Sequence, residues 1–305
     1  MRFKINRIDN KNGPSIFGYR LKEQLELMQD WEYSEGFPEY NLCFSVGNYI
    51  DGAINILRLD GLYFDTENTL GDTTRMNACI KNAYAKFDGV IFQTEFSRIM
   101  YCGHFGYPSA PSTIIHNGAP VEFTKGYSYT YPWRGKTLMC SSHWRAHKRL
   151  DAVVAGFMEL NDPDTGLVII GKADKSYDND KNIMHVPDTQ PKDIPFLLRG
   201  ADAFVHLAWL DWCPNVVVEA LTARLPVLCS HNGGTKELVG DDGIVLKLED
   251  DYDFKSVALY DPPKPDPVTV AQGMRDILSR EWDIHRPDLR IENVARQYSD
   301  FMKGF

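Results

Sequence analysis

The chain of 305 residues carries 33 basic and 42 acidic side chains, for a formal net charge of −9. This balance is opposite to the basic excess that holds a nucleic-acid backbone by charge, so the sequence gives no strong nucleic-acid signal. With 43% hydrophobic and 25% charged residues, the chain has the composition of a globular protein that is long enough for two domains.

The sequence gives little indication of a transmembrane segment, a signal peptide or a metal site. No run of 18 apolar residues is present, and the N-terminus, MRFKINRIDN, turns polar at once. Six scattered cysteines without a CxxC pair are typical of the reduced thiols of an intracellular protein. The eight histidines have no HExxH or paired ligand spacing. We therefore expect a cytoplasmic protein with no transmembrane segment, no cofactor and no metal; the oligomeric state cannot be inferred.

The first part of the chain alternates short apolar segments with amphipathic ones. Strands are predicted over residues 3–8, 42–46, 53–59, 89–93 and 112–120. Helices are predicted over residues 16–28, 72–87 and 94–106, the last capped by Thr94. A strand, a Gly-containing loop over 9–15 and a helix form the opening of a Rossmann-like unit. Asp60 follows a strand, where α/β folds place their sites, although Asp60-Gly61 is equally a turn-forming pair.

A second alternation follows an aperiodic segment. Residues 121–136, rich in Tyr, Pro and Gly, have the composition of an interdomain linker. Strands are then predicted over residues 137–142, 167–171, 183–186, 201–208 and 243–248, and helices within 143–160 and over 193–201, 268–280 and 289–303. Five or so strand–helix alternations predict an α/β fold with a parallel, doubly wound sheet.

The stretch over residues 209–237, WLDWCPNVVVEALTARLPVLCSHNGGTKE, combines several features of a binding site. Pro214 suits the start of a helix, and the free backbone N–H groups at Asn215 and Val216 would form an anion site. Glu219 falls within this helix and Asp211 lies eight positions before it. Gly233 and Gly234 would let the backbone approach a ligand closely. The alternative is an ordinary strand-loop-helix-strand passage.

The densest cationic segment, HWRAHKR over residues 143–149, follows a predicted strand and opens a helix. Cations and helix N–H groups at one strand end suit a diphosphate. The alternative is a solvated basic helix start, which the helix macrodipole disfavours.

Together these segments resemble the nucleotide-sugar site of retaining GT-B glycosyltransferases, glycosyltransferase family four (group 1). That family has an acidic residue, seven residues, a glutamate, a Pro-Val strand and a Gly-Gly…Glu loop, matched here by Asp211, Glu219, Pro226-Val227, Gly233-Gly234 and Glu237. Lys148 matches the lysine of the phosphate loop. Two positions depart from the pattern: Asp211 replaces the usual Glu, and Ser142 replaces an Arg whose guanidinium Arg145 could supply.

The resemblance implies a GT-B fold of two Rossmann-like domains facing a cleft. Residues 1–120 would bind the acceptor, 121–136 would be the linker, 137–288 would bind the donor, and 289–305 would cross back to the first domain. The implied reaction is metal-independent transfer from a UDP- or GDP-sugar, by front-face attack assisted by the leaving diphosphate.

The resemblance also implies residue roles. The expected catalytic residues are Lys148, Arg145 and Asp211. The expected donor-binding residues are Glu219, Ser142, Pro214, Asn215, Val216, Gly233 and Gly234. Residues on the cleft or acceptor side would be Gly13, Pro14, Asp60 and Asn117, since the family has a glycine loop near the first strand and an Asn-Gly closing the last strand of the first domain.

Two alternatives from other classes stay open: a GT-B-shaped nucleotide-sugar epimerase and a catalytically inactive nucleotide-sugar-binding protein. The acceptor is also open among saccharide, glycoconjugate, lipid-linked sugar, protein and modified nucleobase. Residues 1–22 hold six basic side chains and one acidic one, which hints at an anionic acceptor; a solvated edge is the alternative.

Overall fold

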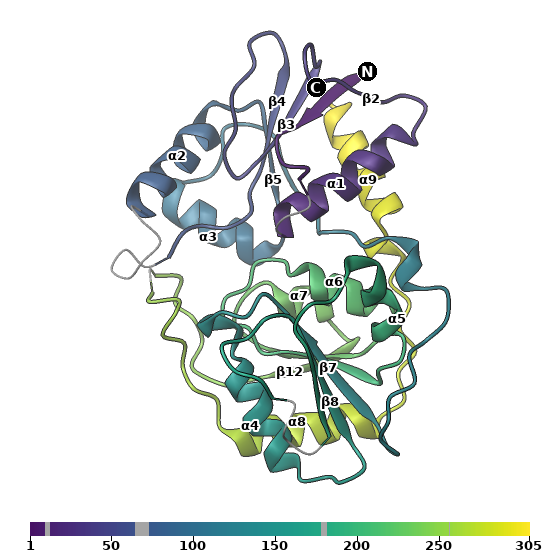
Figure 1. Cartoon of the computed structure of the whole chain (residues 1–305). Coiled ribbons are helices and arrows are strands. Elements are labelled where there is room, and N and C mark those ends of the chain that lie inside the picture. The colour runs from purple at the N-terminus through teal and green to yellow at the C-terminus, as the bar shows by residue number, and fades with distance from the viewer. Residues whose placement is uncertain (10–12, 65–72, 178–181, 256) are drawn as a thin grey trace.

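The computed structural model describes residues 1–9, 13–64, 73–177, 182–255 and 257–305. This part of the chain forms two six-stranded parallel sheets, each flanked by helices and stacked one above the other in Figure 1. The predicted α/β class is confirmed. Residues 10–12 of the predicted first loop and residue 72, the predicted start of a helix, lie outside the described residues.

The first sheet has the strand order β2-β1-β3-β4-β5-β6. Its strands are β1 (Arg2–Ile5), β2 (Glu32–Tyr33), β3 (Tyr40–Phe44), β4 (Ile54–Arg58), β5 (Gly89–Phe92) and β6 (Ser112–Ile114), and its helices are α1 (Gly13–Glu26), α2 (Thr73–Lys86) and α3 (Glu95–Phe105). Successive strand residues point to opposite faces, so Ile56 packs beneath α1 while Leu57 packs beneath α2 and α3. As predicted, Thr94 caps α3 by accepting a hydrogen bond from the Ser97 N–H at 3.1 Å.

The last helix, α9 (Ile291–Met302), belongs to the core of the first sheet although it is last in the chain. It lies beside α1 in Figure 1 and buries Val294, Tyr298 and Met302 against that sheet. The Trp31 indole N–H donates to Ser299 Oγ at 2.9 Å. The predicted return of the C-terminal helix to the first half of the chain is therefore confirmed.

The chain passes twice between the two halves, and the two connecting segments run side by side. The N–H of Ala119 donates to the carbonyl of Leu289 at 2.9 Å, and the N–H of Ile291 donates to the carbonyl of Ala119 at 3.0 Å. A 3₁₀ turn over Pro287–Leu289 precedes α9, which therefore starts two residues later than the sequence predicts. The strand predicted over 112–120 ends at Ile114, because residues beyond it enter this crossing.

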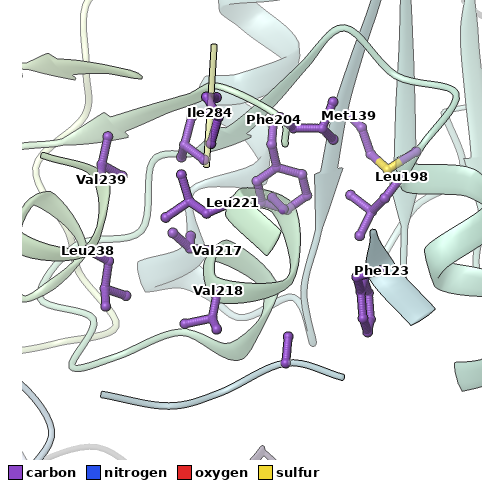
Figure 2. Close-up of a cluster of buried hydrophobic side chains, with 14 of the residues drawn as sticks. Phe123, Met139, Leu198, Phe204, Val217, Val218, Leu221, Leu238, Val239 and Ile284 are labelled. Atoms are coloured by element: carbon purple, nitrogen blue, oxygen red, sulfur yellow. The ribbon is translucent and has the colours of Figure 1, made fainter. Parts of the chain in front are cut away.

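The second sheet has the order β12-β11-β10-β7-β8-β9. Its strands are β7 (Thr137–Ser141), β8 (Gly166–Ile170), β9 (Ile183–Val186), β10 (Ala203–His206), β11 (Val227–Ser230) and β12 (Gly243–Leu246), and its helices are α4 (Leu150–Leu160), α5 (Ile194–Leu198), α6 (Asn215–Thr222), α7 (Thr235–Val239) and α8 (Pro267–Ser279). Figure 2 shows the core on the α6 face, where Val217 and Leu221 lie near Met139 and Phe204. Helices α4 and α8 cover the opposite face.

Residues 121–136, which we keep as the proposed linker, are packed on the second sheet. Phe123 and Tyr131 are buried in its core, and the ring of Tyr131 stacks on Trp133 with centroids 5.2 Å apart. The Tyr131 hydroxyl donates to the carbonyl of Leu197 at 3.0 Å. Sequence composition alone did not predict this packing, because the aromatic residues lack the periodicity of a regular element.

Each sheet has one point at which the strand order reverses direction. In the second sheet this switch point lies between β7 and β10, and in the first sheet it lies between β1 and β3. Loops leaving the carboxyl ends of such neighbouring strands diverge to opposite faces and leave a crevice, which is where open α/β sheets bind ligands. Within the described residues, no helix combines the length and the apolar character needed to cross a membrane.

Packing of α9 makes a direct prediction. Met302→Ala removes a fully buried side chain and should lower the free energy of unfolding by about 2–5 kcal/mol. Met158→Ala is the matched control, because this helical methionine is 52% exposed and should change stability by less than about 0.5 kcal/mol. Chemical denaturation followed by circular dichroism measures both.

Hydrogen exchange locates the effect of Met302→Ala. Exchange should accelerate in β1 and α1, which share a core with α9, and not in β7 and β8. Equal acceleration in both halves would mean that α9 does not stabilise the first half selectively.

Candidate functional site

Two predicted residues meet at the switch point of the second sheet. The chain leaving β7 forms a 3₁₀ turn over Ala146–Lys148, and the chain leaving β10 carries Asp211. The ammonium of Lys148 forms an ion pair with Asp211 Oδ2. Both loops are also joined through the backbone, since the N–H of Trp209 donates to the carbonyl of His147 at 2.8 Å.

A histidine completes this cluster. His206, the last residue of β10, has its Nε2 2.9 Å from the same Asp211 Oδ2. Burial lowers the pKa of His206, with Asp211 offsetting only part of this, so the imidazole is neutral at pH 7. A neutral imidazole must carry its proton on Nε2 to donate to a carboxylate, which fixes the tautomer.

The charge state of the carboxylate follows from these contacts. Burial by itself would raise the pKa of Asp211, but Lys148 and His206 outweigh it and hold that pKa well below its usual range. Burial, reinforced by Lys148, lowers the pKa of His147 to about 3. The side chains of Lys148 and Asp211 are only 17% and 13% exposed. The switch point therefore presents one ammonium and one carboxylate at fixed positions beside neutral imidazoles.

The predicted glycines are required by the backbone around Asp211. The backbone of Asp211 forms an isolated parallel β-bridge with that of Gly233, and the N–H of Gly234 donates to the Asp211 carbonyl at 2.7 Å. Gly233 has φ of 110°, and a Cβ at Gly234 would lie 2.1 Å from the carbonyl oxygen of Trp212. A side chain at either glycine would therefore displace the loop that positions the carboxylate.

Glu219 lies one turn into α6 and faces the first half of the chain. Its Oε1 accepts from the guanidinium of Arg20, on α1, at 2.6 Å, and both side chains are largely buried. Pro214 precedes the helix in extended conformation, and among the described residues no side chain caps the first turn. The backbone N–H groups at Asn215 and Val216 thus stand at a helix N-terminus, where anions are stabilised.

Two residues predicted on the acceptor side contact the second half through Asn215. The Asn117 Nδ2 donates to Asn215 Oδ1 and to the carbonyl of Cys213, each at 2.8 Å. The Asn215 Nδ2 donates to the carbonyl of Gly13 at 2.9 Å. Gly13 and Pro14 open α1, so the start of this helix meets the start of α6.

Asp60 is held inside the first half. Its carboxylate forms an ion pair with Arg58 and accepts hydrogen bonds from Ser45 Oγ at 2.6 Å and Gln93 Nε2 at 3.0 Å. Because both oxygens already have donors, the contacts of Asp60 are those of a carboxylate that holds neighbouring strand ends together.

The remaining predicted residues of the cationic segment have different surroundings. Arg145 is exposed and begins the turn that carries Lys148. Ser142 is half-buried, and its N–H donates to the carbonyl of Ile170 at 3.2 Å. Arg149 is buried and pairs with Glu249 at 2.9 Å, so it serves the packing of the second half. The backbone of Arg149 is left-handed, with φ of 55°, which turns the chain into α4.

Sequence reasoning missed Arg20 and His206. Arg20 lies 199 positions from its partner, so spacing along the chain contains no signal for the pair. His206 could have been found, because a histidine at the end of an apolar strand next to a predicted acidic loop is unusual. Glu237, quoted for its motif, accepts hydrogen bonds from the Glu95 N–H at 2.7 and 2.9 Å and thereby stabilises the N-terminus of α3 in the first half.

Part of the chain is similar in sequence to known proteins. Residues 132–258 match the family model described as Glycosyl transferases group 1. Over 102 residues the chain is 28% identical to the O-antigen chain mannosyltransferase B of Escherichia coli, a match that covers 32% of this chain and 26% of that protein. The matched segment thus spans about a quarter of this curated relative.

Solved structures match the whole chain. The sucrose-phosphate synthase of Thermosynechococcus elongatus superposes with a TM-score of 0.75 at 12% identity, covering 99% of this chain and 98% of that one. The Anabaena protein HepE in complex with UDP-glucose superposes with a TM-score of 0.65 at 12% identity, covering 100% and 99%. Such identities show a shared fold. The segment over residues 132–258 thus resembles the glycosyl transferases group 1 family, and the two facing Rossmann-like halves with a returning C-terminal helix form the GT-B fold.

Proposed function

We propose that the chain is a retaining glycosyltransferase, which moves a sugar from a UDP- or GDP-sugar to a saccharide or glycoconjugate acceptor. The observation that carries this proposal is the Lys148–Asp211–His206 cluster at the switch point of a group 1 domain, with Glu219 on the next helix. The fold it shares with HepE, which was solved with UDP-glucose, supports a nucleotide-sugar as the donor.

The contacts suggest how a donor would lie. Glu219 has one carboxylate oxygen on Arg20, which leaves Oε2 to accept from ribose hydroxyls. Lys148 and the first turn of α6 stand at neighbouring strand ends, so both can face a diphosphate. Asp211, between them, would accept hydrogen bonds from the sugar hydroxyls.

These contacts also bear on the reaction. The carboxylate of Asp211 is a weak nucleophile, because its negative charge is already stabilised by the Lys148 ammonium and the His206 hydrogen bond. This supports attack from the same face as the departing diphosphate. The chain then mainly has to stabilise the charge that grows on the leaving group, using donors that are already in position. We expect no metal to be required.

Nucleotide release tests the proposed reaction. The chain is incubated with labelled UDP- and GDP-sugars, with and without a panel of saccharide acceptors. Acceptor-dependent release of nucleotide supports a transferase. Isomerisation of the donor without acceptor would indicate an epimerase, and tight donor binding without turnover would indicate a binding protein.

The first site prediction concerns Lys148. Lys148→Ala should lower kcat by about 10²–10³, because an ammonium that meets growing charge acts more strongly in the transition state than in the ground state. Lys148→Arg should restore only part of the activity, since the planar guanidinium of arginine does not reproduce the compact charge of the lysine ammonium. Arg145→Ala tests whether Arg145 supplies the guanidinium absent at Ser142.

The control for Lys148 is Lys125→Ala, an exposed lysine in the segment between the halves, which should keep normal kcat. Circular dichroism checks that each variant folds. A folded Lys148→Ala protein with wild-type turnover would remove the diphosphate role of this residue.

The second site prediction concerns Glu219. Glu219→Ala should weaken binding of free UDP or GDP on the order of tenfold, because it removes a charged acceptor of two ribose hydroxyls. Arg20→Ala keeps the carboxylate and should weaken binding less. Isothermal calorimetry measures both, with exposed Glu281→Ala as the matched control. Unchanged nucleotide affinity in Glu219→Ala would count against the assignment.

The third site prediction separates the sugar from the nucleotide. Asp211→Asn should leave nucleotide affinity within about twofold and lower kcat on the order of 10², because it keeps the shape of the side chain but loses its charge. His206→Leu removes the donor that orients Asp211 and should also lower kcat, whereas His206→Gln retains a donor and should be less impaired. Steady-state kinetics with calorimetry tests this, and an equal loss of nucleotide affinity in Asp211→Asn would refute it.

A further inference from the structure

The loop over residues 209–212, with the sequence WLDW, places an acidic residue among apolar ones. It follows β10 in the second half of the chain, yet its apolar side chains pack in the first half. Trp209 and Leu210 are buried in the hydrophobic cluster formed by residues of β4, β5, α2 and α3, and Trp212 packs against the same cluster. The loop that carries Asp211 is therefore inserted into the core of the other half.

Trp212 contacts the first half through both its ring and its backbone. The ring centroid lies 5.2 Å from that of Phe96 and 5.8 Å from that of Tyr101, both on α3. A Cβ at Gly61 would lie 2.5 Å from the indole Nε1, so the indole packs directly on the backbone of Gly61. The Trp212 carbonyl accepts from Thr94 Oγ1 at 3.1 Å, which joins the loop to the N-cap of α3.

The backbone of the 209–212 loop has an unfavourable conformation. Leu210 has φ of 56°, in the left-handed region that residues with a side chain rarely adopt. Such a conformation persists only where the surrounding contacts enforce it. Here the contacts are those of the first half, because Leu210 is only 1% exposed and lies in the same cluster as its neighbour Trp209.

This conformation determines where the carboxylate of Asp211 points. The N–H of Trp212 donates to Asp211 Oδ1 at 3.1 Å. The other oxygen, Oδ2, pairs with Lys148 and lies 2.9 Å from His206 Nε2. A shift of Trp212 would move the donor that holds Oδ1, and the carboxylate could then turn away from Lys148 and His206.

We propose that Trp212 is a positioning residue for Asp211. Its indole, packed in the first half, holds the 209–212 loop so that the carboxylate stays paired with Lys148 and His206. Docking of the two halves thereby sets the geometry of a group that belongs to the second half. The effect on turnover rests on the glycosyltransferase function proposed above, whereas the effect on the position of the carboxylate rests on these contacts.

Removal of the indole should affect turnover more than nucleotide binding. Trp212→Ala should lower kcat by about 10–10², because a small displacement of a catalytic group has an effect of this size. The Kd of UDP or GDP should stay within about twofold. Trp212→Phe keeps an aromatic ring in the cluster and should lose less activity. Trp212→Leu takes the place of Trp212→Ala in every measurement if the alanine variant does not fold.

The matched control is Phe87→Ala. Phe87 is 5% exposed and belongs to the same cluster, where its ring packs against Tyr49 with centroids 5.9 Å apart. Its replacement also weakens the core of the first half, but at the contact with Tyr49 rather than at Trp212. Below the unfolding transition of each variant, Phe87→Ala should therefore keep normal kcat.

The imidazole of His206 gives a readout that does not require turnover. Its Nε2–H, hydrogen-bonded to Asp211, should give a downfield, slowly exchanging proton resonance in the NMR spectrum, assigned by its loss in His206→Gln. In Trp212→Ala this resonance should move upfield or be lost through exchange with water. In Trp212→Phe and in Phe87→Ala it should stay in place.

Wild-type kcat in the folded Trp212→Ala protein would overturn the proposal, as would an unchanged His206 resonance in that variant. An equal loss of kcat in Phe87→Ala would also overturn it, because destabilisation of the core would then be responsible. So would a loss of nucleotide affinity as large as the loss of kcat. Failure of the glycosyltransferase proposal looks different, because the wild-type chain would then turn over no donor while the His206 resonance still responds to Trp212→Ala.

Discussion

The candidate site depends on two opposite charges placed in contact at the ends of neighbouring parallel strands. Lys148 and Asp211 are 63 positions apart, yet the strand order brings β7 and β10 together and leaves their loops facing each other. Charges this far from water are costly unless they are paired and hydrogen-bonded, so removing one partner leaves the other uncompensated. His206 and the backbone N–H of Trp212 satisfy further lone pairs of Asp211. The backbone at Gly233 and Gly234 packs closely against the loop that carries Asp211, which leaves no room for a side chain at either glycine.

A second constraint is that both halves of the chain build the surroundings of the site. Polar contacts cross between them at Arg20–Glu219 and at Asn117–Asn215, and the carboxylate of Glu237 holds the first turn of α3. Aromatic contacts also join the halves: the ring of Phe96, on α3, lies with its centroid 5.2 Å from that of Trp212 and 6.3 Å from that of Tyr252. The two chain segments that connect the halves are also hydrogen-bonded to each other at Ala119. Any opening of the halves would have to break these contacts, which would tie the proposed donor binding to the position of α1 and α3.

The fold was largely predictable from sequence because its strands are continuous apolar runs, as expected where helices cover both faces of a sheet. The two-residue strand Glu32–Tyr33 and the five-residue helix Thr235–Val239 were missed, since such short elements contain no measurable periodicity. Within the site, Lys148 and Asp211 were predicted from their segments, but their ion pair was not, because spacing cannot show which strand ends are neighbours. Arg20 was missed for the same reason. Asp60 was singled out from its place after a strand, and sequence could not show that Arg58, two residues earlier, engages its carboxylate.

The central claim is that the reversal point between β7 and β10 is where a nucleotide-sugar binds. A crystal structure of the chain with bound UDP or GDP tests it most directly. The account predicts a diphosphate against Lys148 and the first turn of α6, with ribose hydroxyls within hydrogen-bonding distance of Glu219. A nucleotide bound away from these two strand ends, with the Lys148–Asp211 pair and the Glu219–Arg20 pair undisturbed and solvent beside them, would contradict it.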